Sequence, residues 1–268
     1  MGSVVVGREV AMEAPLAGRT ALVTGAGNGL GQAITEHLAL AGARVILVGR
    51  NRDKLVQACS ELGFDDSQCR VETCDVTDPA SVTELARVLA TEDISILVNN
   101  AGVPGPVSDL VNIDPVEWDR VFDTNVRGVF LVCQAFLPGM KRAGFGDIVN
   151  IASVSGKRPL AGRTPYCASK MAVIGLTITL AAEVGRDDIR VNTLSPGPVR
   201  GPRMERNLLL EAERTGASYD DAEAVFVSRS ALGRMVEEKE VGQALVAMLQ
   251  MPGLTAADID LSAGMVAR

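Results

Sequence analysis

The sequence predicts an α/β protein in which helices cover both faces of a parallel β-sheet. Two observations carry this prediction. From residue 19 onward, short apolar runs rich in β-branched residues alternate with longer helical patterns, which is typical of successive strand–helix units. The 268 residues are 47% hydrophobic and 22% charged, a composition suited to one large globular domain.

Seven segments are candidate strands. Turn residues flank most of the first six, and the seventh has the weakest pattern. In chain order the segments are residues 20–24, 43–48, 70–74, 94–98, 147–151, 189–194 and 258–261.

The helical patterns between these strands have clear boundaries. Asn51 and Gly63 enclose one pattern as N-cap and C′ glycine, and Asp78 followed by proline opens the next. Two later helices, residues 115–138 and 165–184, are apolar on more than one face, which exceeds what packing against one sheet requires. We therefore expect helices 115–138 and 165–184 to lie in the interface of a homo-oligomer, a dimer or a tetramer.

The domain organisation predicted from the sequence is simple. No repeat or change of composition divides the chain, so residues 18–268 are expected to form a single domain, preceded by a loose extension at residues 1–17. The stretch 197–230 is rich in Pro, Arg and Glu and stands where a strand-to-helix connection should be short. We expect this stretch to form a lid over a substrate site.

Charge and rare residues exclude several classes of function. Because 26 Lys and Arg face 33 Asp and Glu, for a net charge of −7, nucleic acids and acidic membranes are poor candidate partners. A single histidine, His37, cannot build a multi-histidine metal site, and no metal is expected. No uninterrupted apolar run approaches the ~18–20 residues that cross a bilayer.

The cysteines indicate the redox environment. They are odd in number and form no CxxC pair, which favours reduced thiols in the cytoplasm over a disulfide framework. Their positions are Cys59, Cys69, Cys74, Cys133 and Cys167.

A glycine-rich turn directly follows the first strand. It reads TGAGNGLG, with Gly25, Asn28, Gly29 and Leu30 in its centre, and a helical pattern starts at once. Such a turn lets the backbone approach a pyrophosphate, whose charge is then held by free N–H groups at the helix N-terminus. A glycine-rich turn without a ligand is the alternative that this motif alone leaves open.

Further polar segments fall at the ends of successive strands, where open α/β sheets bind their ligands. The third strand ends at Asp75 and Val76, and the fourth at the sequence NNAG, which contains Asn99, Ala101 and Gly102. Taken singly, each of these segments also fits a capping or turn role.

A tyrosine and a lysine form the most informative pair. Tyr166 and Lys170 are four residues apart at the start of a helix, so they share one face, and the ammonium lowers the pKa of the nearby phenol. Such a tyrosine can serve as general acid or base. Ser153 ends the fifth strand, where its hydroxyl can hydrogen-bond the oxygen that Tyr166 protonates.

Together these motifs resemble the short-chain dehydrogenase/reductase family, in its compact single-domain branch. The similarity covers residues 19 to about 200 and rests on TGAGNGLG, CDV, NNAG, Asn125 within DTNVRGVF, Ser153, YCASK at 166–170 and SPGPV at 195–199. It implies a Rossmann-like, doubly wound sheet of seven parallel strands in the order 3-2-1-4-5-6-7, with a nicotinamide cofactor over the strand ends. It also implies NAD(P)-dependent hydride transfer between a ketone and a secondary alcohol.

The resemblance further implies a role for each matching residue. Tyr166 would exchange a proton with the substrate oxygen, while Lys170 lowers the phenol pKa and holds the nicotinamide ribose. Ser153 would position the substrate oxygen, and Asn125 would anchor a water between Lys170 and solvent. The remaining implied cofactor contacts are Asp75 and Val76 at the adenine, Asn99 at the ribose beside the central strand, and Pro196, Gly197 and Val199 at the nicotinamide.

The cofactor preference depends on the end of the second strand. That strand ends at Gly49-Arg50 without an acidic residue to bind the ribose hydroxyls, and Arg50 can pair with a 2′-phosphate. We therefore expect NADP(H) to be preferred, with NAD(H) as the alternative. Gly201 departs from the family, which often has threonine at this position.

The substrate and two other functions remain as alternatives. Arginines in the lid and between Ser153 and Tyr166 suggest an anionic or strongly polar substrate, unless they are solvated or pair with Glu205, Glu211 and Glu213. The arginines are Arg158, Arg163, Arg200, Arg203 and Arg206. A non-catalytic dinucleotide-binding sensor or scaffold would not need the four predicted catalytic residues together, and enoyl reductases space their tyrosine and lysine farther apart.

Overall fold

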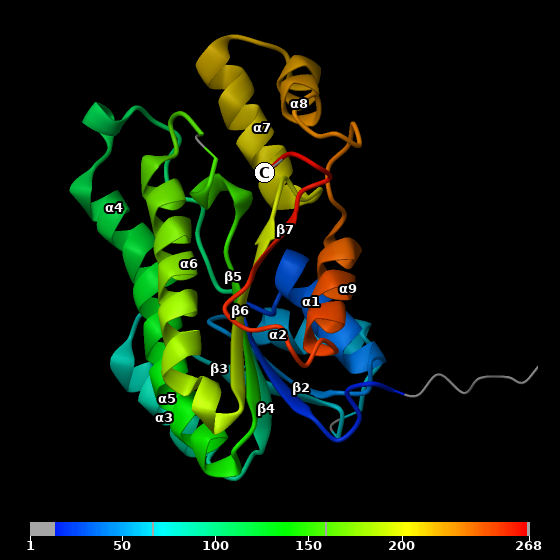
Figure 1. Ribbon diagram of the computed structural model, residues 1–268. Helices are drawn as coiled ribbons and strands as arrows, with labels where there is room; N and C mark the ends of the chain where they lie inside the picture. The colour runs from blue at the N-terminus through cyan, green and yellow to red at the C-terminus, as the bar shows by residue number, and fades with distance from the viewer. Residues whose placement is uncertain (1–13, 66, 159, 267–268) are drawn as a thin grey trace, which may run out of the picture.

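The computed structural model describes residues 14–65, 67–158 and 160–266, and Figure 1 shows their arrangement. Seven strands form one sheet in which every neighbouring pair is parallel, in the order β3-β2-β1-β4-β5-β6-β7. This is the predicted strand order. The strands are β1 (Thr20–Thr24), β2 (Arg44–Gly49), β3 (Cys69–Thr73), β4 (Ile94–Asn99), β5 (Gly146–Ile151), β6 (Ile189–Pro196) and β7 (Asp258–Leu261).

Helices cover both faces of the sheet, as predicted (Figure 1). One face packs against α1 (Gly29–Leu40), α2 (Arg52–Glu61) and α9 (Glu238–Leu249). The other packs against α3 (Pro79–Val88), α5 (Gly128–Ala143) and α6 (Thr164–Val184). Alternation along the strands supplies both cores: in β1, Ala21 and Val23 belong to the first cluster and Leu22 to the second.

The helix predicted at residues 115–138 differs from the structure. The chain there forms α4 (Pro115–Phe122), a π-helical turn η2 (Asp123–Arg127) and then α5, which continues to Ala143. Pro138 therefore lies inside α5, and the helix ends at Gly144, a left-handed residue. The short 3-10 turns are η1 (Leu110–Asn112), η3 (Val154–Gly156) and η4 (Gly185–Asp187).

The segment predicted as a lid contains two helices above the carboxyl ends of the strands (Figure 1). These are α7 (Pro202–Thr215) and α8 (Tyr219–Val227). They pack together through a small separate apolar cluster that includes Met204, Leu208 and Ala222. The helices are thus held mainly to each other, above the sheet.

The predicted extension at residues 1–17 is wrong at its end. Residues 1–13 lie outside the described part of the chain, but Leu16 is buried in the core beside α1. Its backbone N–H donates to the carbonyl of Ala41 at 2.8 Å. Among residues 14–17 only Leu16 enters the core, and a single buried side chain produces no periodicity in the sequence.

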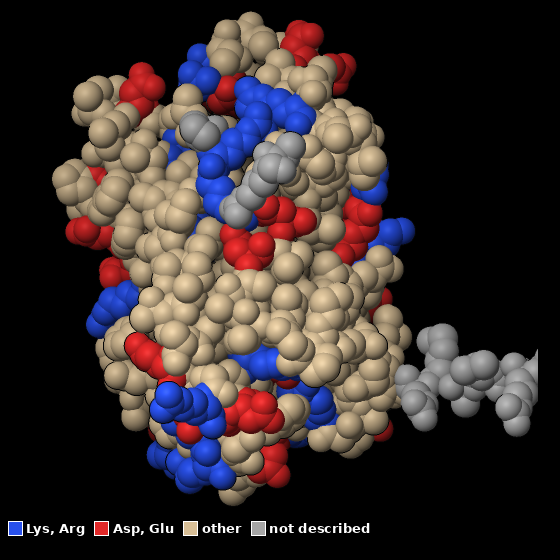
Figure 2. Space-filling view, viewed as in Figure 1, with Lys and Arg blue, Asp and Glu red and all other residues tan. Residues whose placement is uncertain are grey.

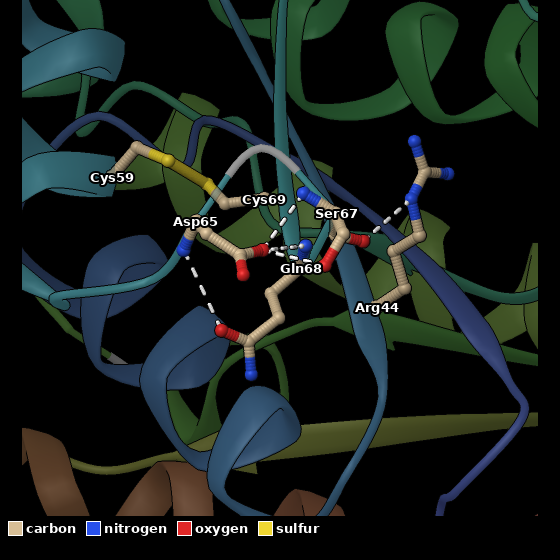
Figure 3. The surroundings of a disulfide bond; sticks show 6 residues. All are labelled: Arg44, Cys59, Asp65, Ser67, Gln68 and Cys69. Atoms are coloured by element: carbon tan, nitrogen blue, oxygen red, sulfur yellow. Dashed lines mark hydrogen bonds between the residues drawn. A yellow bond between two sulfur atoms is a disulfide. The ribbon is translucent and has the colours of Figure 1, made fainter.

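The prediction that all five cysteines are reduced is also wrong, because Cys59 and Cys69 form a disulfide (Figure 3). Cys59 lies in the last turn of α2 and Cys69 begins β3, so the chain returns to bring their Cα atoms within 6.3 Å. Asp65 holds the intervening turn by accepting hydrogen bonds from the N–H groups of Ser67 and Gln68. Cys74, Cys133 and Cys167 are free.

Candidate active site

The glycine-rich turn between β1 and α1 presents backbone donors to a cavity. Gly25 has φ +66°, and a Cβ at Gly31 would lie 2.1 Å from the Gly25 carbonyl oxygen, so the turn requires glycine at both positions. The Asn28 side chain makes no capping hydrogen bond, and α1 has no acidic residue in its first turn. The first N–H groups of α1 are therefore available to an anion, as a dinucleotide's diphosphate requires.

The segment after β4 is tied to this turn. The Thr24 hydroxyl accepts hydrogen bonds from the N–H groups of Asn100 and Ala101 at 3.0 and 3.1 Å, and the Asn100 amide donates to the carbonyls of Thr24 and Gly25. Asn99, which was expected at the cofactor ribose, instead points into the core. Its amide donates to Asn150 at 2.8 Å, because side chains alternate along β4.

One cavity of about 640 Å³ runs along the carboxyl ends of the strands. All of the predicted catalytic and cofactor residues line it except Asn99 and Asn125. The lining residues predicted from the sequence are Gly25, Asn28, Gly29, Leu30, Arg50, Asp75, Val76, Ala101, Gly102, Ser153, Tyr166, Lys170, Pro196, Gly197 and Val199.

Two basic side chains line the cavity near the glycine turn. Arg50 follows β2, and Lys54 lies in α2, where its Cβ would be 3.3 Å from a Cβ built at Gly27. Burial opposes ionisation of Asp75, but hydrogen bonds from Thr77 and the charge of Arg50 hold the pKa of this carboxyl below its usual value. Lys54 was not predicted as a site residue, since nothing in its own sequence context distinguishes it from a solvated helix lysine.

Tyr166, Lys170 and Ser153 converge at the middle of the cavity. Lys170 is buried, its ammonium nitrogen lies 5.8 Å from the centroid of the Tyr166 ring, and it donates a hydrogen bond to the Ile151 carbonyl at 2.7 Å. Ser153 stands just after β5, and its hydroxyl also caps the following turn by accepting from the Ser155 N–H. The spacing of four residues on α6 thus produces the pairing predicted from the sequence.

The surrounding charges set the acidity of Tyr166. Burial alone would raise the pKa of the phenol, but the positive charges of Lys170 and Arg203, hydrogen bonding from Ser153 and the charge of Arg163 lower it below its ordinary value. Burial lowers the pKa of Lys170. A phenol that ionises more readily than usual can exchange protons in both directions near neutral pH.

Asn125 lies in the π-helical turn, outside the cavity lining. Its amide accepts from the Val103 N–H at 2.8 Å and donates to the Val103 carbonyl and the Ser169 hydroxyl, both at 3.0 Å. Oδ1 retains one lone pair and lies, like the Lys170 ammonium, next to the backbone of Gly102. π-Helical turns are frequent at functional sites, and this one aims Asn125 at α6.

Two further charged residues in or near the site were not predicted from the sequence. Lys157 binds Asp258 at 2.6 Å and also Asp260, which joins the turn after Ser153 to β7. Glu238, the first residue of α9, lines the cavity, and its Oε1 would lie 3.3 Å from a Cβ built at Gly29 and 2.8 Å from one at Gly201. Lys157 contacts Asp258 across 101 positions of sequence, and Glu238 lies beside a glycine turn at the other end of the chain, so local patterns contain no signal for them.

Helix α6 is apolar enough to resemble a membrane span. The stretch Thr164–Asp187 is long and apolar enough to cross a membrane, by length and composition alone. In the structure this helix packs against β6 and supplies Tyr166 and Lys170 to the cavity. Its apolar character is that of a helix in the core of an α/β fold.

Comparison with known proteins agrees with this geometry. Residues 19–212 match the family model described as short chain dehydrogenase. D-threitol dehydrogenase of Mycolicibacterium smegmatis is 43% identical over 185 residues, covering 68% of this chain and 70% of the relative. A solved NAD+-bound xylitol dehydrogenase has a TM-score of 0.88 at 29% identity, covering 93% of this chain and 99% of that chain. A solved actinorhodin polyketide ketoreductase with NADPH has a TM-score of 0.86 at 33% identity, covering 92% and 97%.

The chain therefore belongs to the short-chain dehydrogenase family. It is an NAD(P)-dependent oxidoreductase that transfers hydride to or from a small molecule.

Proposed function

We propose that this enzyme interconverts a ketone and a secondary alcohol, with Tyr166 as the general acid and base. The observation that carries the proposal is the position of the Tyr166 phenol at the cavity, between Ser153 and the ammonium of Lys170. The bound nicotinamide supplies or accepts the hydride, while Tyr166 exchanges the proton at the substrate oxygen.

The neighbouring side chains support this role. Lys170 spends one of its three donors on Ile151, which leaves two to face a ribose or a water. Ser153 lies beside Tyr166, and the hydrogen bond that its hydroxyl donates to the Pro196 carbonyl is long, 3.4 Å, so the hydroxyl can turn toward a substrate oxygen. Asn125 acts as a positioning residue, because it fixes Val103 and α6 around the lysine.

Substitution of Tyr166 by phenylalanine tests the mechanism. Turnover of carbonyl compounds should fall by roughly 10²–10⁴-fold, because the proton donor is removed, while cofactor binding measured by fluorescence titration persists. Tyr219→Phe, the chain's other tyrosine, is the matched control and should retain full activity. Unchanged turnover in Tyr166→Phe would show that the assignment is wrong, and no turnover even by the native enzyme would favour the sensor or scaffold alternative.

We also propose that NADP(H) is the preferred cofactor. Arg50 and Lys54 are the charges that would face a 2′-phosphate, and no carboxylate stands at position 49, where Gly49 ends β2. Arg50→Ala should reduce kcat/KM for NADP by roughly tenfold or more and that for NAD very little, whereas Arg52→Ala, outside the cavity lining, should change neither. A higher kcat/KM of the native enzyme with NAD would contradict the preference.

Self-association through α4, α5 and α6 remains our proposal for the quaternary structure. Phe130, Met171 and Ile178 are 47–48% exposed and lie on α5 and α6, which both cover the same face of the sheet. Light scattering of the native chain should give a dimer or a tetramer. Replacement of Phe130 and Ile178 by aspartate should give a monomer, while the same change at Leu232, far from these helices in sequence, should not.

Two further expectations also remain proposals. Helices α7 and α8 are proposed to close as a lid over the substrate end of a single domain, since Arg203, Met204 and Asn207 of α7 line the cavity.

The cytoplasmic location also remains a proposal. It rested in part on the expectation of reduced cysteines, and the Cys59–Cys69 disulfide removes that support. Fractionation of the source cells, followed by immunoblotting, would test the location.

A further inference from the structure

Two arginines flank Tyr166 at the substrate end of the cavity. The guanidinium carbons of Arg163, at the start of α6, and Arg203, in the first turn of α7, lie 5.7 and 5.9 Å from the centroid of the Tyr166 ring. Both residues line the cavity. Two segments almost forty residues apart therefore direct positive charge at the same reacting group.

Arg163 is buried and has no counter-ion among the described residues. Only 7% of the residue is exposed, and its Nε has no hydrogen-bond partner. Its other nitrogens donate long hydrogen bonds to neutral oxygens, to Asn207 at 3.2 Å and to the Pro104 carbonyl at 3.4 Å. Burying a charge without a counter-ion destabilises the folded protein, unless a bound ligand supplies the missing negative charge and hydrogen-bond acceptors.

The nearby carboxylates are occupied elsewhere. Glu211 faces Arg163 from the lid, but both of its oxygens bind Arg214 at 2.7 and 3.0 Å. Among the described residues, neither Arg163 nor Arg203 forms an ion pair, whereas Arg200 pairs with Glu223 and Glu237. Neither Arg163 nor Arg203 is therefore paired with a glutamate, which was the alternative to an anionic substrate.

The rest of this end of the cavity is also basic. Arg158 and Arg229 line it, as does Lys170. Figure 2 shows basic side chains gathered in the upper part of the face drawn, near the region where Figure 1 places α7 and the C-terminal segment. The local charge is thus opposite to the net charge of the chain, −7.

We propose that Arg163 and Arg203 form an anion subsite, so that the substrate is a small hydroxy or oxo compound carrying a carboxylate or phosphate a few bonds from the reacting carbon. This proposal rests on the proposed ketone–alcohol chemistry at Tyr166. An anion would accept hydrogen bonds from the N–H groups of Arg163. A planar guanidinium group can bind two oxygens of a carboxylate or phosphate at once.

The kinetic test compares matched charged and neutral substrates. The probes are 2-, 3- and 4-oxopentanoate against their methyl esters, and dihydroxyacetone phosphate against dihydroxyacetone, each with saturating cofactor. The native enzyme should prefer the best anion over its neutral partner by roughly tenfold or more in kcat/KM. The oxo acid and phosphate series distinguish the two kinds of anion.

Variants assign that preference to the two arginines. Arg163→Gln should lower the ratio of kcat/KM for the anion to kcat/KM for its neutral partner by roughly tenfold, mainly through KM for the anion. The loss of positive charge beside Tyr166 affects both substrates alike and cancels in this ratio. Arg203→Gln, at an exposed position that tolerates substitution, should act in the same direction. Arg206→Gln, in the same helix but outside the cavity lining, is the matched control and should behave like the native enzyme.

A binding measurement separates this proposal from the catalytic one. Calorimetric titration with malonate, succinate and inorganic phosphate should detect binding to the native protein that Arg163→Gln weakens by roughly tenfold, even if no carbonyl compound is turned over. Equal kcat/KM for charged and neutral partners, an equal loss of both in Arg163→Gln, or absence of anion binding to the native protein would each overturn the anion subsite.

Discussion

The ammonium nitrogen of Lys170 lies 5.8 Å from the centroid of the Tyr166 ring, one helical turn away in α6. Because the charges of Lys170 and Arg203 lower the pKa of Tyr166, alcohol oxidation, which needs the phenolate, should rise with pH through an apparent pKa below 10. Ketone reduction, which needs the protonated phenol, should fall over the same range. Both limbs are read from kcat/KM against pH.

Removal of a positive charge should move that pH profile upward. Arg203→Gln leaves the phenolate less stabilised, so the midpoint for oxidation of a neutral alcohol should shift to higher pH. Lys170→Met should shift it further and reduce kcat by roughly 100-fold or more. Arg206→Gln provides the control profile, and a midpoint unmoved by both other variants would show that a different group controls the titration.

Glu238 should weaken cofactor binding. Burial and the charge of Glu237 raise the pKa of this carboxyl, which faces the proposed diphosphate position at Gly29. Glu238→Gln should bind NADP more tightly than the native enzyme by about three- to tenfold at pH 8, since one repulsive charge is removed. As the pH falls and Glu238 becomes protonated, the native affinity should approach that of the variant.

A neighbouring glutamate provides the comparison for that titration. Glu237→Gln, outside the cavity lining, should have the native affinity at pH 8, and its affinity should begin to rise at a lower pH than in the native enzyme, because the charge that raises the pKa of Glu238 is removed. Weaker binding in Glu238→Gln would instead mean that the carboxylate accepts a hydrogen bond from the cofactor.

Lys157 should stabilise the fold through β7. It is buried between Asp258 and Asp260, so Lys157→Gln leaves carboxylates without their partner and should cost about 3 kcal/mol of unfolding free energy at pH 7. Burial opposes ionisation of Asp258, but hydrogen bonds from Lys157, Ser195 and Thr193 hold its pKa below the usual value. Its stabilising contribution is therefore complete above the unfolded pKa and is lost as the pH falls through the lower folded pKa.

Denaturation at several pH values measures this effect. The difference between Lys157→Gln and the native protein should narrow below about pH 4, where unfolded aspartate is protonated. Lys141→Gln breaks the half-exposed pair with Asp187 and should cost less than about 1 kcal/mol. A comparable loss in the two variants would rule out a special role for Lys157.

The Cys59–Cys69 disulfide should contribute to stability by closing a loop with a sequence separation of 10. In the chain-entropy picture a loop of this size contributes about 2–3 kcal/mol. Reductant should therefore lower the Tm by several degrees, and it should have no effect on the Cys59→Ser, Cys69→Ser double variant. Alkylation of five thiols in the denatured, unreduced protein would show that the bond is not formed in solution.

The fold and the centre of the site follow from local sequence patterns, whereas the long-range partners do not. The glycine turn and the Tyr166–Lys170 pair lie within single strand–helix units, so their spacing specifies their geometry. The orientation of Asn99 could not be predicted in this way, because whether a side chain at a strand end faces a cavity or Asn150 depends on β5, which adjoins β4 in the sheet although Asn150 follows Asn99 by 51 positions in the sequence. The disulfide, Lys157 and Glu238 likewise depend on contacts that only the assembled sheet creates.

The π-helical turn at Asp123–Arg127 changes the direction in which the side chains of α5 point relative to those of α4. A π turn holds one more residue than an α turn, and each residue of an α-helix turns the side-chain direction by about 100°. Asn125 can therefore face α6 while Phe130, one turn later, faces outward. Deletion of one residue in this turn would restore a regular α-helix. Asn125 could then no longer face α6 while Phe130 faces outward.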